Sequence, residues 1–354
     1  MLFGLLYLIH RNKVTPLKEN YHMTDKEKPF NDDALRAECH KKGSETISLP
    51  SRLERYSKSK ARQLKIVNYL RDIANGKIPF KKEYPIDFQK HSSLVGSCGN
   101  YLVFNNYYTV DKVRLAKASF CKTHLLCPLC AIRRGSKQVQ GYLSKFNDVM
   151  SRNAHLEAQF LTLTVKNGFD FKERLEHLQD AVKALLKSRR NFSSRGNGFN
   201  EFCKIEGAVY SYEFSYSEKH GWHPHIHMVV LVDKKNPIHF DVRNPKNSQL
   251  SKDWLALTGD SFIVDCRPLK GEPSEAFCEV FKYALKYSSM SIGNNILAFM
   301  HLKGRRLQGS FGVFRGVKID TTLTDDLLDD LPYIELFYKY TSAGYSLSQS
   351  KHVE

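Results

Sequence analysis

The sequence predicts an α+β fold: an antiparallel-sheet palm with helices packed on one side. Four runs of residues have the two-residue alternation, or the dense branched and apolar content, of strands. Two further segments repeat apolar residues at helical spacing. Their order along the chain is strand, helix, hairpin, strand, helix, which is typical of an antiparallel sheet covered by helices.

Composition divides the chain into four parts. A polar lead-in without periodicity precedes a basic region with a helix and several cysteines, which is followed by the palm and by an acidic flank. These parts span residues 1–55, 56–145, 146–320 and 321–354. The helix of the basic region is predicted to begin at Ser57 and to stop at Gly76. The flank is predicted to be a terminal helix or a segment that binds a partner.

The palm is built from four predicted strands and two predicted helices. Its first strand alternates apolar residues with threonine, as a half-buried strand does. Pro273 precedes the second helix, where its missing N–H is tolerated. The strands span residues 160–165, 207–216, 221–231 and 262–266, and the helices span residues 175–190 and about 274–289.

The hairpin of the palm carries a candidate metal site. His225 and His227 are two residues apart, so both imidazoles point to the same face of a strand. If the turn closes near Gly221, Glu213 of the preceding strand lies opposite one of them. Two imidazoles and a carboxylate suit Mg²⁺ or Mn²⁺ and could also hold Zn²⁺ or Fe²⁺. His223 shares this face and is the alternative to Glu213, which we favour as third ligand.

The basic region carries a candidate structural zinc site. Cys127 and Cys130 flank a Pro-Leu pair in a tight knuckle, and Cys121 and Cys98 precede it. Four thiolates close the tetrahedral site that structural Zn²⁺ requires. His124 is the alternative to Cys98 as the fourth ligand.

Positive charge follows the knuckle and also dominates the whole chain. Arg133, Arg134 and Lys137 are predicted to point outward and to contact DNA. The chain has 54 Lys and Arg against 37 Asp and Glu, a formal net charge of +17. A balance this basic indicates a polyanionic partner, and nucleic acid is the usual one.

The sequence predicts neither a membrane span nor export. The apolar residues 1–9 are too few to cross a bilayer, and they lack the basic start and cleavage site of a signal peptide. Eight cysteines, several in a metal-like cluster, are consistent with a reducing compartment. We therefore expect a cytoplasmic protein without a membrane partner.

The last predicted helix of the palm carries a candidate catalytic stripe. Glu279, Tyr283 and Tyr287 stand at steps of four and share one face of a helix. A tyrosine that faces a metal-bound phosphate is a competent nucleophile. Its phenol has a pKa near ~10, so activation must come from the metal or from a cation such as Lys286. Glu279 could act as general base for water.

These motifs together resemble those of the HUH endonucleases, and specifically the plasmid rolling-circle replication initiators of small Gram-positive plasmids. The run from His225 to His227 resembles their His-hydrophobic-His signature, and residues 160–164 resemble their first strand motif. The knuckle with its two arginines is also similar. Four residues of the last helix resemble the tyrosine motif of that group: Glu279, Lys282, Tyr283 and Lys286. The resemblance spans roughly residues 98–287.

The resemblance implies nicking of one strand of plasmid origin DNA, either single-stranded or melted from a duplex. Tyr283 would attack the scissile phosphate, keep a 5′-phosphotyrosyl link and release a 3′-hydroxyl that primes polymerase. Glu279 matches a glutamate that is associated, in that group, with the hydrolytic step ending a round. His225, His227 and Glu213 would hold the metal. Host helicase and DNA polymerase are implied partners, because the sequence has no Gly-x-x-x-x-Gly-Lys-Ser/Thr run.

Three alternatives stay open. Tyr287 is the alternative second nucleophile, although Glu279 already supplies the second activity. A transposase or mobilisation relaxase would use the same chemistry on a different element. A non-catalytic, zinc-stabilised regulator would bind DNA without cutting it.

Overall fold

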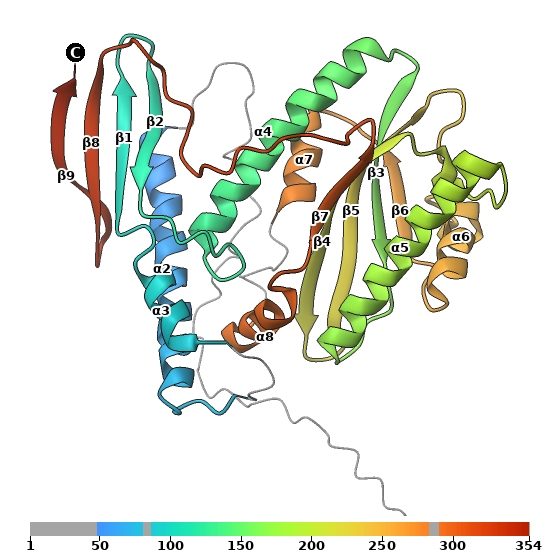
Figure 1. Cartoon of the computed structure of the whole chain (residues 1–354), viewed down its shortest axis with the longest axis horizontal. Coiled ribbons are helices and arrows are strands. Elements are labelled where there is room, and N and C mark those ends of the chain that lie inside the picture. The colour runs from blue at the N-terminus through green and yellow to red at the C-terminus, as the bar shows by residue number, and fades with distance from the viewer. Residues whose placement is uncertain (1–47, 81–85, 283–289, 354) are drawn as a thin grey trace, which may run out of the picture.

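The computed structural model describes residues 48–80, 86–282 and 290–353. Two antiparallel sheets lie at opposite ends of the molecule, with helices between and around them (Figure 1). The α+β class predicted from the sequence is therefore confirmed. The helices are α2 (Leu49–Ala74), α3 (Phe88–Gly96), α4 (Pro128–Arg152), α5 (Phe171–Arg195), α6 (Gln249–Thr258), α7 (Pro273–Phe281) and α8 (Ile292–Leu302).

The larger sheet has five strands in the order β6-β3-β5-β4-β7, and every neighbouring pair is antiparallel. The predicted hairpin lies at its centre and turns tightly before Gly221, which has a φ of +73°. A Cβ at that glycine would meet the carbonyl oxygen of Gly168 at 2.5 Å. The strands are β3 (Leu156–Thr164), β4 (Gly207–Ser217), β5 (Gly221–Asp233), β6 (Val264–Pro268) and β7 (Gln308–Gly312).

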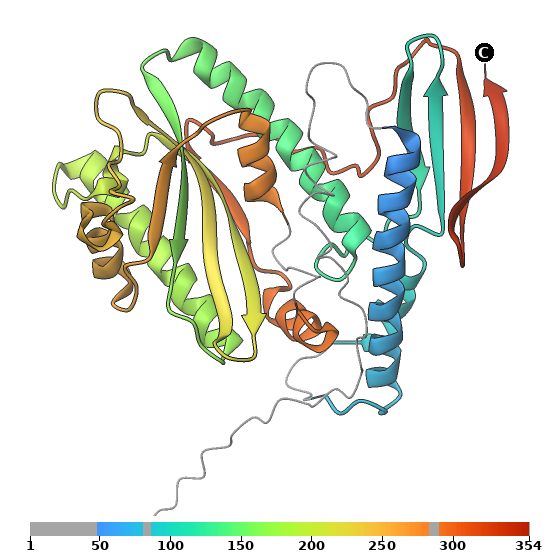
Figure 2. The same ribbon diagram turned by 180° about the vertical axis from the view of Figure 1, so that it is seen from behind.

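Helices cover both faces of this sheet, so the prediction of helices on one side is wrong. On β5, Met228 and Val230 join a core with Leu178 of α5, whereas Val229 joins a second core with Phe277 of α7. Helix α5 lies in front of the sheet in Figure 1, and α7 lies in front of it in Figure 2. The physical reason is visible in β5, where residues 228–232 are apolar without interruption. A strand buried on both faces has this pattern, whereas a half-buried strand alternates.

The smaller sheet joins residues 101–118 to the C-terminal residues 333–353. Its order is β2-β1-β8-β9, so the C-terminal hairpin pairs with a hairpin that precedes the knuckle. Helix α2 lies against it (Figure 2). The prediction of a terminal helix in the flank is therefore wrong. The strands are β1 (Tyr101–Tyr107), β2 (Lys112–Ala118), β8 (Tyr333–Thr341) and β9 (Gly344–Val353).

Two helix boundaries also differ from the prediction. Helix α2 begins at Leu49 rather than at Ser57. Its first turns bury Arg52 and Tyr56, and these residues do not belong to the apolar repeat from which the start of the helix was predicted. Helix α7 ends at Phe281, and Lys282 already has an extended ψ of 164°. The predicted helix therefore does not run unbroken through Lys282, and its remaining residues, 283–289, lie outside the described residues.

Candidate functional site

The centre of the larger sheet brings together three of the predicted metal ligands. Glu213 of β4 pairs directly with His225 of β5, which confirms the predicted register. The Nε2 atoms of His225 and His227 lie 3.3 and 3.2 Å from the two carboxylate oxygens of Glu213. All three side chains are buried. Ligand atoms around one cation, with bonds of about 2.1 Å, are separated by about 3.0–3.4 Å, so these donors fit a divalent metal.

The outer nitrogens of both imidazoles have partners that orient the rings. His227 Nδ1 lies 3.1 Å from the hydroxyl oxygen of Thr162 on β3. His225 Nδ1 lies 3.4 Å from the backbone carbonyl oxygen of His223. With a cation bound, a proton on Nδ1 would leave the lone pair of each Nε2 free to coordinate it, which is the arrangement that metal-binding histidines adopt.

The electrostatics of the cluster favour a neutral His227 beside an ionised Glu213. Burial lowers the pKa of His227, and Glu213 only partly opposes this effect. Burial would raise the pKa of Glu213, but hydrogen bonds from His225 and His227 and the charge of Lys282 bring it well below its usual value. Neutral imidazole and carboxylate are the ligand forms that bind cations.

Lys282 connects this cluster to the end of helix α7. Its Nζ lies 3.2 Å from Oε2 of Glu213 and also contacts the carboxylate of Glu279. Burial would raise the pKa of Glu279, but the nearby ammonium group of Lys282 lowers it. Glu279 is therefore ionised and lies next to the His225/His227/Glu213 cluster. Tyr283, Lys286 and Tyr287 lie outside the described residues.

The alternative third ligand has a different position. His223 pairs with Ser215 across the hairpin, and its Nδ1 lies 2.7 Å from Oδ1 of Asn167. It does not belong to the group of converging ligand atoms, which contains Glu213 instead. Of the two alternatives, the structure therefore brings Glu213 to the histidine pair.

The four cysteines of the predicted zinc site also converge. The Sγ atom of Cys98 lies 3.5 Å from those of Cys127 and Cys130, and the Sγ of Cys121 lies 3.6 Å from that of Cys130. Zn–S bonds of about 2.3 Å in a tetrahedron put the sulfurs about 3.8 Å apart. His124 is absent from this group, so Cys98 occupies the fourth position.

Helix α2 supports the cysteine cluster from outside. Lys60 is buried and its Nζ donates to the backbone carbonyls of Gly96 and Cys98, at 3.0 and 2.6 Å. The Nε2 of Gln63 also donates to the carbonyl of Cys98 at 3.0 Å, and its Oε1 lies 3.6 Å from the Sγ of Cys127. Burial raises the pKa of Cys127 well above its usual value, so its thiolate needs a nearby cation.

Two of the three predicted DNA contacts are buried in ion pairs, so their prediction as outward-facing residues is wrong. Arg133 is 2% exposed and donates to the carboxylate of Asp325 at 2.6 Å. Lys137 is 5% exposed and pairs with Asp320 and Asp326 at 2.9 and 2.7 Å. The acidic segment before β8 folds back over α4 and neutralises these charges.

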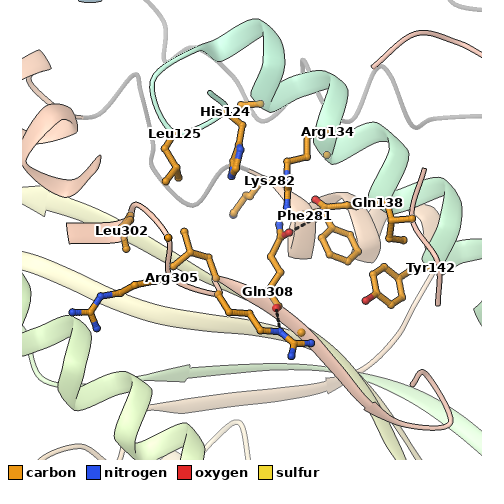
Figure 3. A pocket seen from close by; sticks show the side chains of 17 residues that line it. His124, Leu125, Arg134, Gln138, Tyr142, Phe281, Lys282, Leu302, Arg305 and Gln308 are labelled. Carbon is orange, nitrogen blue, oxygen red and sulfur yellow. Dashed lines mark hydrogen bonds between the residues drawn. The ribbon is translucent and has the colours of Figure 1, made fainter. Parts of the chain in front are cut away.

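Arg134, the third of these residues, is exposed and lines a cavity beside α4 (Figure 3). The sequence alone predicts no role for this cavity, for Lys282 or for Thr162. For Thr162 a signal was present, because it lies on the face of an alternating strand opposite the apolar residues. For the cavity no local signal exists, since its walls come from segments far apart in the sequence.

The fold and the clustered residues define the class: an α+β protein with a buried glutamate–histidine group at the centre of an antiparallel sheet and a separate four-cysteine group. A family model described as "Replication protein" matches residues 112–336, which is more than half of the chain. The chain therefore belongs to this replication protein family. The match confirms the resemblance to replication initiators of Gram-positive plasmids.

Three relatives bear the name "Protein rep". The protein from Staphylococcus aureus is 27% identical over 216 residues, which are 58% of this chain and 87% of that protein. The protein from Lactiplantibacillus plantarum is 26% identical over 266 residues, which are 69% of this chain and 79% of that protein. The protein from Streptococcus pneumoniae serotype 2 is 25% identical over 255 residues, which are 68% of this chain and 74% of that protein.

No solved structure matches the chain significantly. Within the described residues, no helix combines the length and apolar character that crossing a membrane requires.

Proposed function

We propose that this chain starts rolling-circle replication of a plasmid by nicking one strand of origin DNA, as an HUH-type endonuclease. The observation that supports the proposal is the convergence of a buried carboxylate and two imidazoles beside the lysine that precedes the proposed nucleophile. The Glu213, His225 and His227 side chains converge, and Lys282 Nζ lies 3.2 Å from Glu213. Tyr283, the proposed nucleophile, is the next residue in the chain after Lys282.

His225, His227 and Glu213 would hold a divalent cation, Mg²⁺ or Mn²⁺. Bound there, such a cation supplies charge neutralisation and polarisation of a phosphodiester. The protein contributes the orientation of the donors, because Thr162 and the carbonyl of His223 hold the two rings. It also restricts water, since these donors are buried in the sheet.

The proposed nicking step exchanges one phosphodiester bond for another, so the bond remains available for rejoining the strand. The phenolic oxygen of Tyr283 attacks the scissile phosphorus, and a P–O bond to tyrosine forms as the bond to the 3′ oxygen breaks. The phenolic proton ends on the released 3′ oxygen, so neither water nor a redox partner is consumed. The product is a 5′-phosphotyrosyl link and a 3′-hydroxyl that a host polymerase extends. Lys286 is proposed to favour the phenolate by its charge.

Glu279 is proposed to take part in the second cleavage, in which water replaces the tyrosine. Its carboxylate is ionised and about one quarter exposed, and it contacts Lys282. An ionised carboxylate at this place can accept a proton from water as water attacks phosphorus. Hydrolysis by this route leaves no covalent link and therefore ends a round.

The four cysteines are proposed to hold a structural Zn²⁺ ion. Zinc would fix the start of α4 to the loop after α3, since Cys98 follows α3 and Cys130 lies in the first turn of α4. Helix α4 packs on α7, which leads to the proposed nucleophile. Host helicase and DNA polymerase remain proposed partners.

The test is a covalent-adduct assay. Purified protein is incubated with Mn²⁺ and a labelled single strand from the origin of the plasmid that encodes it, and the products are resolved under denaturing conditions. The unaltered protein and the control Tyr108→Phe, at an exposed tyrosine beyond β1, are expected to retain label. Tyr283→Phe is expected to lose it. An adduct that persists in Tyr283→Phe contradicts the assignment.

The assay also separates the alternative functions. A DNA-binding regulator shifts the strand on a native gel without forming an adduct under any divalent metal. A transposase or mobilisation relaxase forms an adduct with the ends or transfer origin of another element and not with the replication origin.

A further inference from the structure

A cavity of about 470 Å³ lies between helix α4 and the edge of the larger sheet (Figure 3). One wall comes from α4 and the loop before it, and the opposite wall comes from residues 302–309, between α8 and β7. Its volume falls in the range of about 300–1,000 Å³ that small-molecule sites occupy. It is therefore large enough for one nucleotide.

Positively charged side chains line the cavity, and two of them are paired with carboxylates that lie outside its lining. Four of its lining residues are cations, and none of the lining residues is Asp or Glu: Arg134, Lys282, Arg305 and Arg306. Arg305 is held by Glu176 and Gln179, each at 3.0 Å. In the part of the chain that the structure describes, neither Arg134 nor Arg306 forms an ion pair. Enclosed cationic walls of this kind concentrate anions.

The surroundings of Arg134 strengthen the case for an anionic ligand. Partial burial lowers the pKa of Arg134, although the residue as a whole is exposed at the cavity wall. Burial and the charge of the same guanidinium lower the pKa of His124, on the same wall of the cavity, to about 4, so that this imidazole is neutral. Arginine binds phosphate oxygens with two parallel hydrogen bonds.

The cavity adjoins the glutamate–histidine cluster. Lys282 lines it and also lies 3.2 Å from Glu213. Gln308, another lining residue, pairs with Ser211 of β4, and Ser211 pairs with His227. Neighbouring strands are about 4.8 Å apart, so the cavity begins about two strands from the histidine pair.

We propose that this cavity binds one nucleotide of the DNA strand next to the scissile phosphate, with Arg134 and Arg306 holding its backbone phosphate. This proposal rests on the proposed nicking function, because it assumes that the DNA strand runs across the cluster of Glu213 and the two histidines. Apolar side chains of Leu125, Leu302 and Phe281 line the same cavity and suit a sugar and base (Figure 3).

The first test measures binding rather than cleavage. A fluorescein-labelled thymidine dodecamer is titrated by anisotropy, without added divalent metal, at several NaCl concentrations. Arg134→Gln with Arg306→Gln is compared with Arg243→Gln, an exposed arginine outside the cavity. Each lost charged contact is expected to weaken binding by about tenfold at low salt. The slope of log affinity against log salt should fall by about 0.7 for each phosphate.

A second measurement uses the unaltered protein, so it stands even if the double variant fails to fold. Phenylglyoxal modification is mapped by mass spectrometry with the dodecamer, with thymidine 5′-monophosphate or with inorganic phosphate present. The proposal is supported if the dodecamer protects Arg134 from modification at a concentration at which the two small anions do not protect it. Equal protection by inorganic phosphate, or protection by none of the three, overturns the proposal.

The two proposals fail separately. If the double variant binds the dodecamer with the affinity and salt slope of Arg243→Gln, the cavity proposal is rejected whatever the adduct assay shows. If Arg134 and Arg306 affect binding but no adduct forms, nicking is rejected and a single-strand binding cavity remains.

Discussion

Replacing Asp325 with asparagine is expected to destabilise the whole molecule, because this carboxylate neutralises two buried arginines. It accepts from Arg52 Nη1 at 2.9 Å, from Arg133 Nη2 at 2.6 Å and from the backbone N–H of Leu115 at 2.7 Å. The Asp325 side chain is only 12% exposed, and that of Arg133 is 2% exposed. The ion cluster ties α2, β2 and α4 to the segment before β8.

The size of the effect follows from burial. Removing one partner of a buried ion pair costs about 3–5 kcal/mol, because the remaining charge loses its compensation. The unfolding entropy is about 2.1 cal/mol/K per residue, or about 0.7 kcal/mol/K for this chain. The melting temperature should therefore fall by about 4–7 °C in Asp325→Asn.

Thermal unfolding at pH 7, followed by circular dichroism, measures this shift. Asp148→Asn is the matched control, because Asp148 pairs with Lys145 and Arg152 on the surface of α4. Exposed ion pairs contribute about 0.2–1 kcal/mol, so the melting temperature of the control should fall by about 1 °C or less. An Asp325→Asn variant that melts together with the control refutes the reasoning.

The pH dependence provides an independent check on the same residue. Burial opposes ionisation of Asp325, but the charges of Arg133 and Arg52 hold its pKa well below the usual range. A carboxyl with a lowered folded-state pKa stabilises the protein above its unfolded pKa of about 3.9, and this contribution is lost as the pH falls below that value. The unaltered protein should therefore lose more stability between pH 5 and pH 3 than Asp325→Asn does.

Three further predictions concern the two proposed metal sites and the order of the chemical steps. Cys127→Ser should lower the zinc content measured by atomic emission from about one ion per chain to near zero, whereas Cys203→Ser, outside the cluster, should keep it. His227→Ala should abolish the Mn²⁺-dependent adduct while leaving binding of single-stranded DNA in the absence of metal within about twofold; an unchanged adduct yield would remove the histidine from the reaction. Glu279→Ala should retain the adduct and lose the hydrolytic second cleavage by about 10²–10⁴-fold in a single-turnover assay. If that cleavage instead persists in Glu279→Ala and fails in Tyr287→Phe, the roles of the two residues are reversed.

Residues close in sequence, and the period of two in strands, were enough to predict the glutamate–histidine cluster. His225 and His227 share a face because successive side chains of a strand alternate, and Gly221 limits where the hairpin can turn. Once that turn is placed, Glu213 must lie opposite a histidine. The cysteine knuckle was predictable for a similar reason, since Cys127 and Cys130 are neighbours in the first turn of α4.

Other features were visible in the sequence but misjudged. The apolar run at residues 228–232 indicated a strand covered on both faces, yet the palm was predicted to have helices on one side only. Helix α7 was extended by its periodicity beyond Phe281, although the backbone of Lys282 leaves the helical conformation where its ammonium group reaches Glu213.

The sequence by itself determined which side chains of one strand or one turn share a face, because backbone geometry fixes those relations over a few residues. Only the tertiary structure decided that Cys98 rather than His124 completes the cysteine group, and that Arg133 lies in the core beside Asp325, 192 positions further along. Contacts of this range depend on how separate helices and sheets pack to bury apolar surface and to compensate buried charge. No local pattern records that packing.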